Sequence, residues 1–123
     1  KFGLPEMGLG IIPAAGGTQT LPRTIGRSRA LEMLLTNRWI EADEAYQFGL
    51  INHVVLKKDL FHTAEEMARK IASYDPLAVR NAKAAVVRGM DLPLSEGLDL
   101  EKRLASELSL RTAQELNVRK GDQ

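Results

Sequence analysis

FGLPE at residues 2–6, followed by IPAAGGTQTL at residues 12–21, is the stretch that decides the fold of this 123-residue sequence. The opening FGL predicts a short strand end, and the prolines and glycines after it predict a loop that turns into a helix beyond Pro13. Glu6 follows Pro5, whose ring fixes its own φ at about −65° and stiffens the backbone just before the carboxylate. The stretch therefore predicts a strand end, a rigid acidic turn and a Gly-rich helix start in quick succession.

The next two blocks of sequence predict helices. In GRSRALEMLLT at residues 26–36, apolar side chains recur at spacings of three and four, which predicts a helix over residues 27–35 with one buried face. The side chains on that face are Ala30, Leu31, Leu34 and Leu35. In EAYQFGLI at residues 44–51, a helix over residues 42–48 is predicted to end at Gly49, because glycine readily takes the left-handed conformation that follows a helix.

Two short strands are predicted beside these helices. Residues 38–40 follow the first helix, and residues 50–56 follow the second and are rich in β-branched side chains, which favour strands. Strands that alternate with helices in this way predict an α/β arrangement for the first part of the chain.

The second half of the sequence predicts three helices. The first follows Asp59, a good N-cap, and ends at the Asp75-Pro76 break; the others span about residues 77–90 and 94–110. Five leucines lie around much of the last helix: Leu94, Leu98, Leu100, Leu104 and Leu108. A helix that is apolar on more than one face has to be covered on more than one side, by the rest of the fold or by another subunit. We favour another subunit.

Composition and charge exclude several classes of protein. An apolar fraction of 44% with 27% charged residues is typical of a globular domain rather than of a disordered chain. Seventeen basic and sixteen acidic residues give a net charge of +1, which is not the basic surface that nucleic-acid binding requires. Since the sequence has no cysteine, it cannot form a disulfide framework, a thiolate nucleophile or a cysteine-ligated metal site. No apolar run is long enough to span a bilayer.

The four blocks together resemble the signature of the crotonase family of enoyl-CoA hydratases and isomerases. That signature reads F-G-x-P-E, then I-P-x-x-G-G-T-Q-x-L, then G-x-x-x-A-x-x-x-x-L-T, then E-A-x-x-x-G-L-[IV], and all four elements occur here in this order. The resemblance covers about residues 1–110. Any one block is a weak signal, whereas four in order are a specific one. One departure is Asn37, which follows Thr36 where the family often has a Thr-Gly pair.

The resemblance implies a fold and a division of the chain. The fold class is α/β to mainly α, as the C-terminal half of a crotonase (ClpP/crotonase-like) fold. Residues 1–73 are expected to complete the α/β core, and residues 74–123 are expected to form a helical region that makes trimer contacts. The other half of the fold is expected to precede Lys1.

The resemblance also implies a reaction and assigns Glu6 to it. Adding water to a 2-enoyl thioester requires a base for the water, an acid for the α-carbon and N–H donors for the thioester oxygen. In the family one Glu lies on a G-G-G-x-E helix and the second in F-G-x-P-E, and Glu6 matches the second. The first Glu and both oxyanion-hole donors are expected before Lys1, so the 123-residue chain alone is expected to be inactive.

The segment that follows is the second expected part of the site. The residue after Pro13 gives its backbone N–H to the attacking water in the family, where it is commonly Gly; here it is Ala14. That donor survives the change if Ala14 has a negative φ. Pro13, Gly16 and Gly17 are expected to bind substrate as parts of this segment, because a turn that opens a helix presents the free N–H groups of its non-proline residues to a ligand. The alternative to a catalytic role is that Glu6 is an ordinary surface glutamate and that Gly16 and Gly17 form a turn that binds no ligand.

Several functions stay open at this point. The first is an enoyl-CoA hydratase; the alternatives are a Δ3,Δ2-enoyl-CoA isomerase, in which one Glu shuttles a proton, and a non-catalytic oligomerisation fragment. RNA binding, known for a crotonase relative, is disfavoured by the charge. We expect no metal and no cofactor other than the coenzyme A of the substrate. The expected partners are acyl-CoA and copies of the same chain, in a trimer or dimer of trimers, with neither nucleic acid nor membrane. A cytoplasmic location is expected, or a mitochondrial one in a eukaryote.

Overall fold

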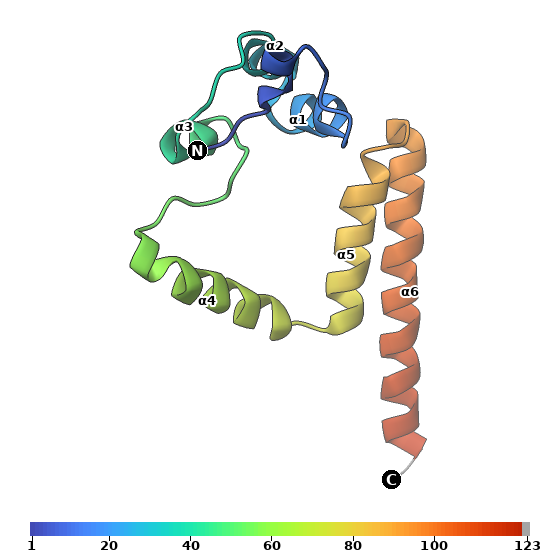
Figure 1. Cartoon of the computed structure of the whole chain (residues 1–123). Coiled ribbons are helices and arrows are strands. Elements are labelled where there is room, and N and C mark those ends of the chain that lie inside the picture. The colour runs from blue at the N-terminus through green and yellow to red at the C-terminus, as the bar shows by residue number, and fades with distance from the viewer. Residues whose placement is uncertain (122–123) are drawn as a thin grey trace. The chain divides into compact units, whose positions relative to one another are not determined.

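A computed structural model describes residues 1–121 of the chain, with side chains for residues 1–111 (Figure 1). The chain divides into two compact units, Lys1–Leu60 and Phe61–Gln123. The predicted division at residues 73 and 74 stays a prediction.

The first unit contains short helices around one small core. They are the 3₁₀ helices η1 (Pro5–Leu9) and η2 (Lys57–Asp59) and the α-helices α1 (Gly17–Ile25), α2 (Arg27–Leu35) and α3 (Ala42–Gln47). Helices α1 and α2 pack side by side, and η1 packs against α2 (Figure 1). The buried side chains of this core are Leu21, Ile25, Ala30, Met33, Leu34, Ile40 and Ala45. Arg38 joins α2 to α3, because its guanidinium pairs with Glu32 at 3.0 Å and with Glu44 at 2.6 Å.

The predicted helix ends are confirmed in this unit. Helix α1 stops at Gly26, whose φ of 85° breaks the helical path, and α2 starts at the next residue. Helix α2 spans the predicted residues, and α3 ends at Gln47, followed by Phe48 and by Gly49 at a φ of 76°. Glycine adopts such angles without the steric cost that a side chain brings.

The predicted strands are wrong for the described residues. Phe2 and Ile40 form one isolated antiparallel bridge, in which each N–H donates to the other residue's carbonyl at 2.9 Å. Residues 50–56 form no strand: Leu50 and Ile51 pack against the core, and residues 53–56 are exposed. A β-branched run needs a neighbouring strand to complete its backbone hydrogen bonds, and the described residues supply none. Instead of a sheet, this unit shows helices held at one edge by a single bridge.

The predicted buried face of α2 is half wrong. Ala30 and Leu34 are buried as expected, and Met33 is buried beside them. Leu31 and Leu35 remain 46% and 65% exposed. The inward side of the helix is therefore rotated away from the Leu31–Leu35 side, which lines a surface pocket instead.

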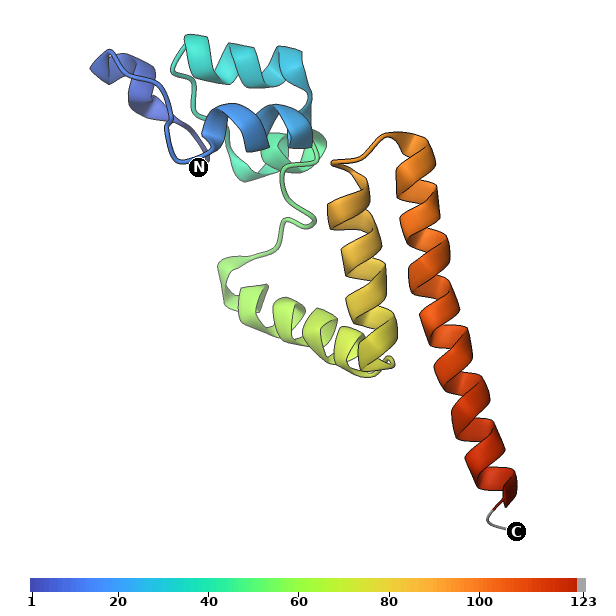
Figure 2. The ribbon, with the colours of Figure 1, turned by 90° about the vertical axis from the view of Figure 1, so that its right-hand side faces the viewer.

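The second unit is dominated by a helical hairpin. Helix α5 (Pro76–Gly89) and the first part of helix α6 (Leu94–Gly121) run antiparallel and pack against each other, and α6 extends beyond α5 (Figures 1 and 2). Asn81 on α5 is buried, and its Nδ2 donates to the Leu104 carbonyl at 3.0 Å and to Glu107 Oε2 at 3.1 Å, both on α6. Near the turn the two backbones approach closely at Gly97, where a Cβ would lie 3.4 Å from the Gly89 carbonyl oxygen.

The ends of the helices follow local signals. Asp75 caps α5, since its Oδ1 accepts the N–H groups of Leu77 at 2.8 Å and Ala78 at 2.9 Å. Helix α4 (Leu60–Ala72) has no buried residue. The predicted end of the last helix near Leu110 is wrong: α6 continues to Gly121, and no Gly or Pro interrupts the sequence between Gly97 and Gly121.

None of the helices that the structure describes combines the length and apolar character needed to cross a lipid bilayer.

Candidate active site

Glu6 lies in a tight turn with one carboxylate oxygen enclosed by protein. It is the second residue of η1, after Pro5, and its own carbonyl accepts the N–H of Ile11 at 3.2 Å. Gly10, at a φ of 73°, ends the turn and donates its N–H to the Met7 carbonyl at 3.1 Å. The Oε2 atom of Glu6 is buried and accepts no hydrogen bond from the described residues. A buried oxygen of this kind is uncommon in proteins and is often found where a ligand or a reaction uses it.

Gly17 brings the two blocks of the signature together. A Cβ on Gly17 would lie 2.8 Å from Leu4 Cδ1 and 2.9 Å from Pro13 Cβ, so there is room only for a hydrogen at this position. Leu4 is two residues before Glu6, and Pro13 begins the second block. The start of α1 is therefore packed directly against both segments, which fixes the approach of the Glu6 turn to the Pro13 turn.

The predicted water-binding donor, Ala14, lies in an exposed turn between Pro13 and α1. Its φ is not positive, which is the condition under which alanine can replace glycine here. Its N–H donates to no backbone carbonyl among the described residues. The N–H group is thus free to donate to a small molecule, although Ala14 and Glu6 form no hydrogen bond with each other.

The predicted substrate-binding residues are placed differently from one another. Pro13 is buried, and Gly16 and Gly17 are half-buried. Gly16 is the N-cap of α1, with a φ of 98°, and its carbonyl accepts the N–H groups of Gln19 at 2.9 Å and Thr20 at 2.8 Å. These contacts explain both glycines structurally, and a contact of Gly16 or Gly17 with substrate stays a prediction.

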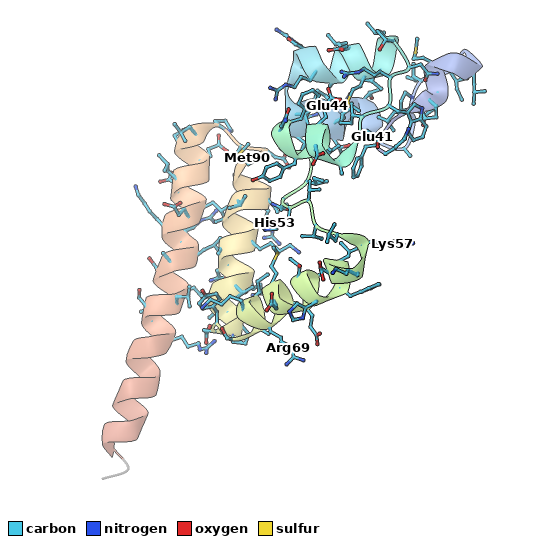
Figure 3. All side chains as sticks on the ribbon, turned by 90° about the vertical axis from the view of Figure 1, so that its left-hand side faces the viewer. Glu41, Glu44, His53, Lys57, Arg69 and Met90 are labelled. Atoms are coloured by element: carbon cyan, nitrogen blue, oxygen red, sulfur yellow. The ribbon has the colours of Figure 1, made fainter. Side chains whose placement is uncertain are left out.

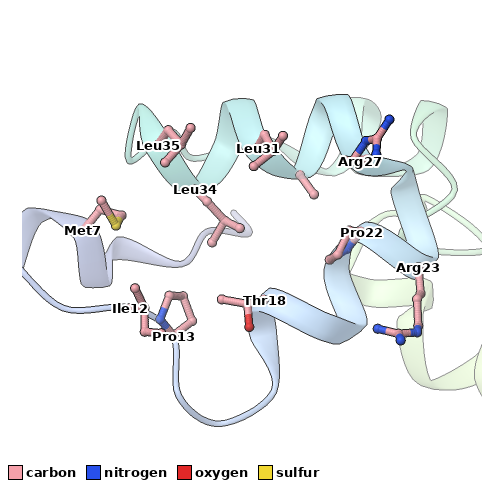
Figure 4. Close-up of a pocket in the computed structure, with 11 residues that line it drawn as sticks. Met7, Ile12, Pro13, Thr18, Pro22, Arg23, Arg27, Leu31, Leu34 and Leu35 are labelled. Atoms are coloured by element: carbon pink, nitrogen blue, oxygen red, sulfur yellow. The ribbon is translucent and has the colours of Figure 1, made fainter.

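A pocket of about 480 Å³ opens between α1, α2 and the Glu6 turn (Figure 4). Leu31, Leu34 and Leu35 point into it from α2 (Figure 4). Facing them are Met7, Ile12, Pro13, Thr18 and Pro22, with Arg23 and Arg27 at the end away from Met7 (Figure 4). Its lining is almost wholly apolar, which is common for sites that hold hydrocarbon.

The sequence alone did not identify this pocket. The sequence predicts a loop at Met7 and Ile12 and core positions for Leu31 and Leu35. The available signal was that α2 has more leucines than one face of a nine-residue helix can bury, a surplus that indicates a surface groove. Outside the pocket, Asn37, a departure from the signature, has a buried side-chain oxygen, Oδ1, that has no hydrogen-bond partner among the described residues.

Known proteins match this chain over most of its length. The family model described as enoyl-CoA hydratase/isomerase matches residues 1–122. The short-chain-enoyl-CoA hydratase of Clostridium acetobutylicum is 49% identical over 90 residues, which make up 73% of this chain and 34% of that protein. The crotonyl-CoA hydratase of Syntrophomonas wolfei is 49% identical over 90 residues, or 73% of this chain and 35% of that protein.

Solved structures give the same match in three dimensions. The crystal structure of an enoyl-CoA hydratase from Bacillus anthracis superposes with a TM-score of 0.85 at 43% identity, covering 95% of this chain and 47% of that one. The chain spans about a third of the length of the curated relatives that it matches.

Proposed function

This chain belongs to the enoyl-CoA hydratase/isomerase family, and from that premise we propose that the complete protein is an enoyl-CoA hydratase with Glu6 as one of its two catalytic carboxylates. The substrate is a 2-trans-enoyl-CoA thioester from fatty-acid or related acyl-CoA degradation. Two relatives that are 49% identical are named for the hydration of short-chain enoyl-CoA and crotonyl-CoA, which supports this choice.

The observation that carries the proposal is the buried, unpaired Oε2 of Glu6. Pro5 precedes Glu6 and Gly10 closes the turn after it, so the backbone that holds the carboxylate is stiff. A catalytic acid or base needs this combination of fixed position and unused hydrogen-bonding capacity. A structural glutamate at this site would instead be expected to accept a hydrogen bond from a neighbouring residue.

The proposed chemistry is a syn addition of water. The water oxygen forms a bond to the β-carbon while the water loses a proton to a carboxylate base, and the α-carbon gains a proton from a carboxylic acid. Glu6 serves as one of this pair, and the second is the family's Glu on a G-G-G-x-E helix, a motif that these 123 residues do not contain. The free N–H of Ala14 orients the water, which lowers the entropic cost of bringing it to the β-carbon.

One observation favours a second candidate, the Δ3,Δ2-enoyl-CoA isomerase. Among the described residues, the turns at residues 5–9 and 13–16 carry one carboxylate, that of Glu6. A single carboxylate can move a proton between the α-carbon and the γ-carbon. In that reaction the base that removes the first proton returns it to the other carbon, so no water is added. Assays with crotonyl-CoA and with a 3-enoyl-CoA separate the two reactions. A hydratase removes the double bond of crotonyl-CoA by adding water, whereas an isomerase converts the 3-enoyl thioester into the 2-enoyl thioester.

The test of the proposal is Glu6→Gln in the complete protein. We expect kcat for crotonyl-CoA hydration to fall at least about a hundredfold, because a positioned acid or base contributes about 10² to 10⁴ in rate. The melting temperature is expected to stay the same, since Oε2 has no partner to lose. Glu65→Gln on the exposed side of α4 is the matched control and should keep the wild-type rate. Wild-type hydration by the Glu6→Gln protein would assign Glu6 to a structural role.

A further inference from the structure

Asn37 has a backbone conformation that glycine would provide at lower cost. Its φ is 55°, and it is the non-glycine residue with a positive φ among those the structure describes. Its N–H donates to the Leu34 carbonyl at 3.3 Å, and the N–H of Arg38 donates to the Met33 carbonyl at 3.0 Å, which is the double hydrogen bond of a Schellman helix end. A glycine would serve this helix end equally well. The backbone alone therefore does not account for the carboxamide at this position.

The side chain of Asn37 packs on the turn that carries Glu6. A Cβ on Gly8 would lie 2.7 Å from Asn37 Nδ2 and 3.6 Å from its Cγ, so the carboxamide occupies the space that a side chain at position 8 would need. The Oδ1 atom of Asn37 is buried and has no hydrogen-bond partner among the described residues. Gly8 is two residues after Glu6 in the same five-residue 3₁₀ helix.

That 3₁₀ helix depends on its neighbours for its position. None of its own residues is buried, so no apolar side chain anchors it in the core. It packs against α2, the helix that Asn37 follows. Because the direction of the Glu6 carboxylate depends on the placement of this turn, a contact that fixes Gly8 also fixes Glu6.

We propose that Asn37 is a positioning residue for Glu6: its carboxamide packs on Gly8 and holds the catalytic turn against the end of α2. This inference rests on the proposed role of Glu6. The inference assigns a function to Asn37, a residue that departs from the Thr-Gly pair of the signature. Gly8 and Asn37 then form a matched pair, because the absence of a side chain at Gly8 leaves room for the Asn37 carboxamide.

The test is a double-mutant cycle in the complete protein, with Gly8→Ala, Asn37→Gly and the two combined. Gly8→Ala pushes the turn off the carboxamide, and Asn37→Gly keeps the positive φ while removing the contact. Each single change is expected to lower kcat about tenfold and to leave KM within about twofold, because small displacements of a catalytic group cost rate rather than binding. The double variant is expected to stay near a tenfold loss, since the collision no longer exists once the carboxamide is removed. Asn52→Gly in an exposed turn is the matched control and should leave kcat unchanged.

Two results would overturn the inference. One is a wild-type kcat for Asn37→Gly; the other is a double variant whose loss is the product of the single losses, about a hundredfold, which would mean that the two residues act independently. If Gly8→Ala does not fold, Asn37→Gly against Asn52→Gly decides the question through the kcat and KM values. If the wild-type protein hydrates no enoyl-CoA, the proposed function fails instead. The melting temperatures of the wild type, the two single variants and the double variant then test the contact between Asn37 and Gly8. Additive changes in melting temperature would overturn the inference as well.

Discussion

Gly17 shows how one missing side chain holds two parts of a site together. Its lack of a Cβ lets Leu4 and Pro13 meet at the first residue of α1, and through them it sets the separation of the Glu6 turn from the Ala14 turn. The φ of Gly17 is not positive, so alanine would be accepted by the backbone and rejected by the packing. The conformation of this residue is ordinary, and its size is what the structure requires.

Gly17→Ala is therefore expected to destabilise the complete protein by about 1–3 kcal/mol, the usual cost of forcing extra atoms into a packed site. It should also lower kcat if Glu6 and Ala14 act as proposed, because Leu4 or Pro13 has to move and both adjoin the turns that hold these two residues. Thermal unfolding and crotonyl-CoA hydration measure the two effects. Gly89→Ala is the matched control, since a Cβ there would meet only Gly97 Cα at 3.9 Å, an ordinary contact. Equal stability of the two variants would refute the steric account.

The start of α5 depends on a charged cap. Hydrogen bonds from the Ala78 and Leu77 N–H groups, together with the nearby Arg111 guanidinium, hold the pKa of Asp75 below its ordinary value of 3.8. Arg111 Nη2 lies 2.8 Å from Asp75 Oδ2, so the same carboxylate links the start of α5 to α6. The Asp75 carboxylate thus both caps α5 and pairs with a residue of α6.

This cap makes the stability of the hairpin depend on pH. The pKa of Asp75 is lower in the folded state than in the unfolded state. The stability that its carboxylate contributes is therefore fully present above pH 3.8 and is lost as the pH falls through the pKa of the folded state. Asp75→Asn keeps a capping oxygen but removes the charge. We expect the wild-type protein to melt above Asp75→Asn at pH 7, and the difference to disappear toward pH 2. Unfolding scans across that range check this, and a difference that does not change with pH would contradict it.

Asn81 is the polar centre of the α5–α6 packing. Its side chain is 4% exposed and donates to both Leu104 and Glu107. Asn81→Ala is expected to cost about 1–3 kcal/mol of unfolding free energy, because the Leu104 carbonyl loses a donor in a place that water reaches poorly. Denaturant unfolding measures this loss. Asn52→Ala, at an exposed position, should cost less than about 0.5 kcal/mol, as surface substitutions usually do; a similar loss in both variants would rule out a special role for the buried amide.

The helices could be predicted from the sequence more reliably than the strands. Gly26, Gly49 and Asp75 act on the backbone within a few residues, so the ends that they set can be identified from the local sequence. The strand predicted at residues 50–56 was wrong because a strand needs a partner that β-branched composition does not reveal. The last helix was predicted too short, although the sequence after Gly97 contains no residue that stops a helix before Gly121.

The candidate site divides in the same way. A sequence motif is enough to select Glu6 and the turn at Ala14 as candidates, and their roles stay predictions. The pocket beside Leu31 and the contact of Asn37 with Gly8 could not be predicted, because they depend on segments that are distant in the sequence and meet only in the fold. Which face of α2 is buried was also decided by such contacts and not by the spacing of its leucines.

The hairpin of the second unit leaves apolar side chains uncovered. Of the five leucines predicted to exceed one small core, Leu100 is buried, while Leu94 and Leu98 are 80% and 47% exposed. Met90, at the end of α5 in Figure 3, is 79% exposed and lines the same surface hollow as these two leucines. Burial of a side chain of this size contributes about 1.5–3 kcal/mol, so a partner that covers this surface gains substantial free energy.

We therefore predict that the chain self-associates through the helices after Asp75, as a trimer or a dimer of trimers. Light scattering at several concentrations measures the mass, and Met90→Glu with Leu98→Glu is expected to shift it toward the monomer. Val54→Glu with Leu56→Glu, at exposed positions of the first unit, is the matched control. A monodisperse monomer at high concentration would contradict the prediction. A broad aggregate would mean that another part of the complete protein covers these side chains.

The pair of hydrogen bonds between Phe2 and Ile40 has a consequence for how the first unit opens. These bonds tie the second residue of the chain to a residue beyond α2, so they close a long loop that contains Glu6, Ala14 and Asn37. Closing such a loop is entropically costly, so the bonds persist only while the helices inside it stay packed. The Phe2 amide is thus protected by the cooperative stability of the whole loop. Proton exchange at this single amide reports whether the turns that hold Glu6 and Ala14 are assembled.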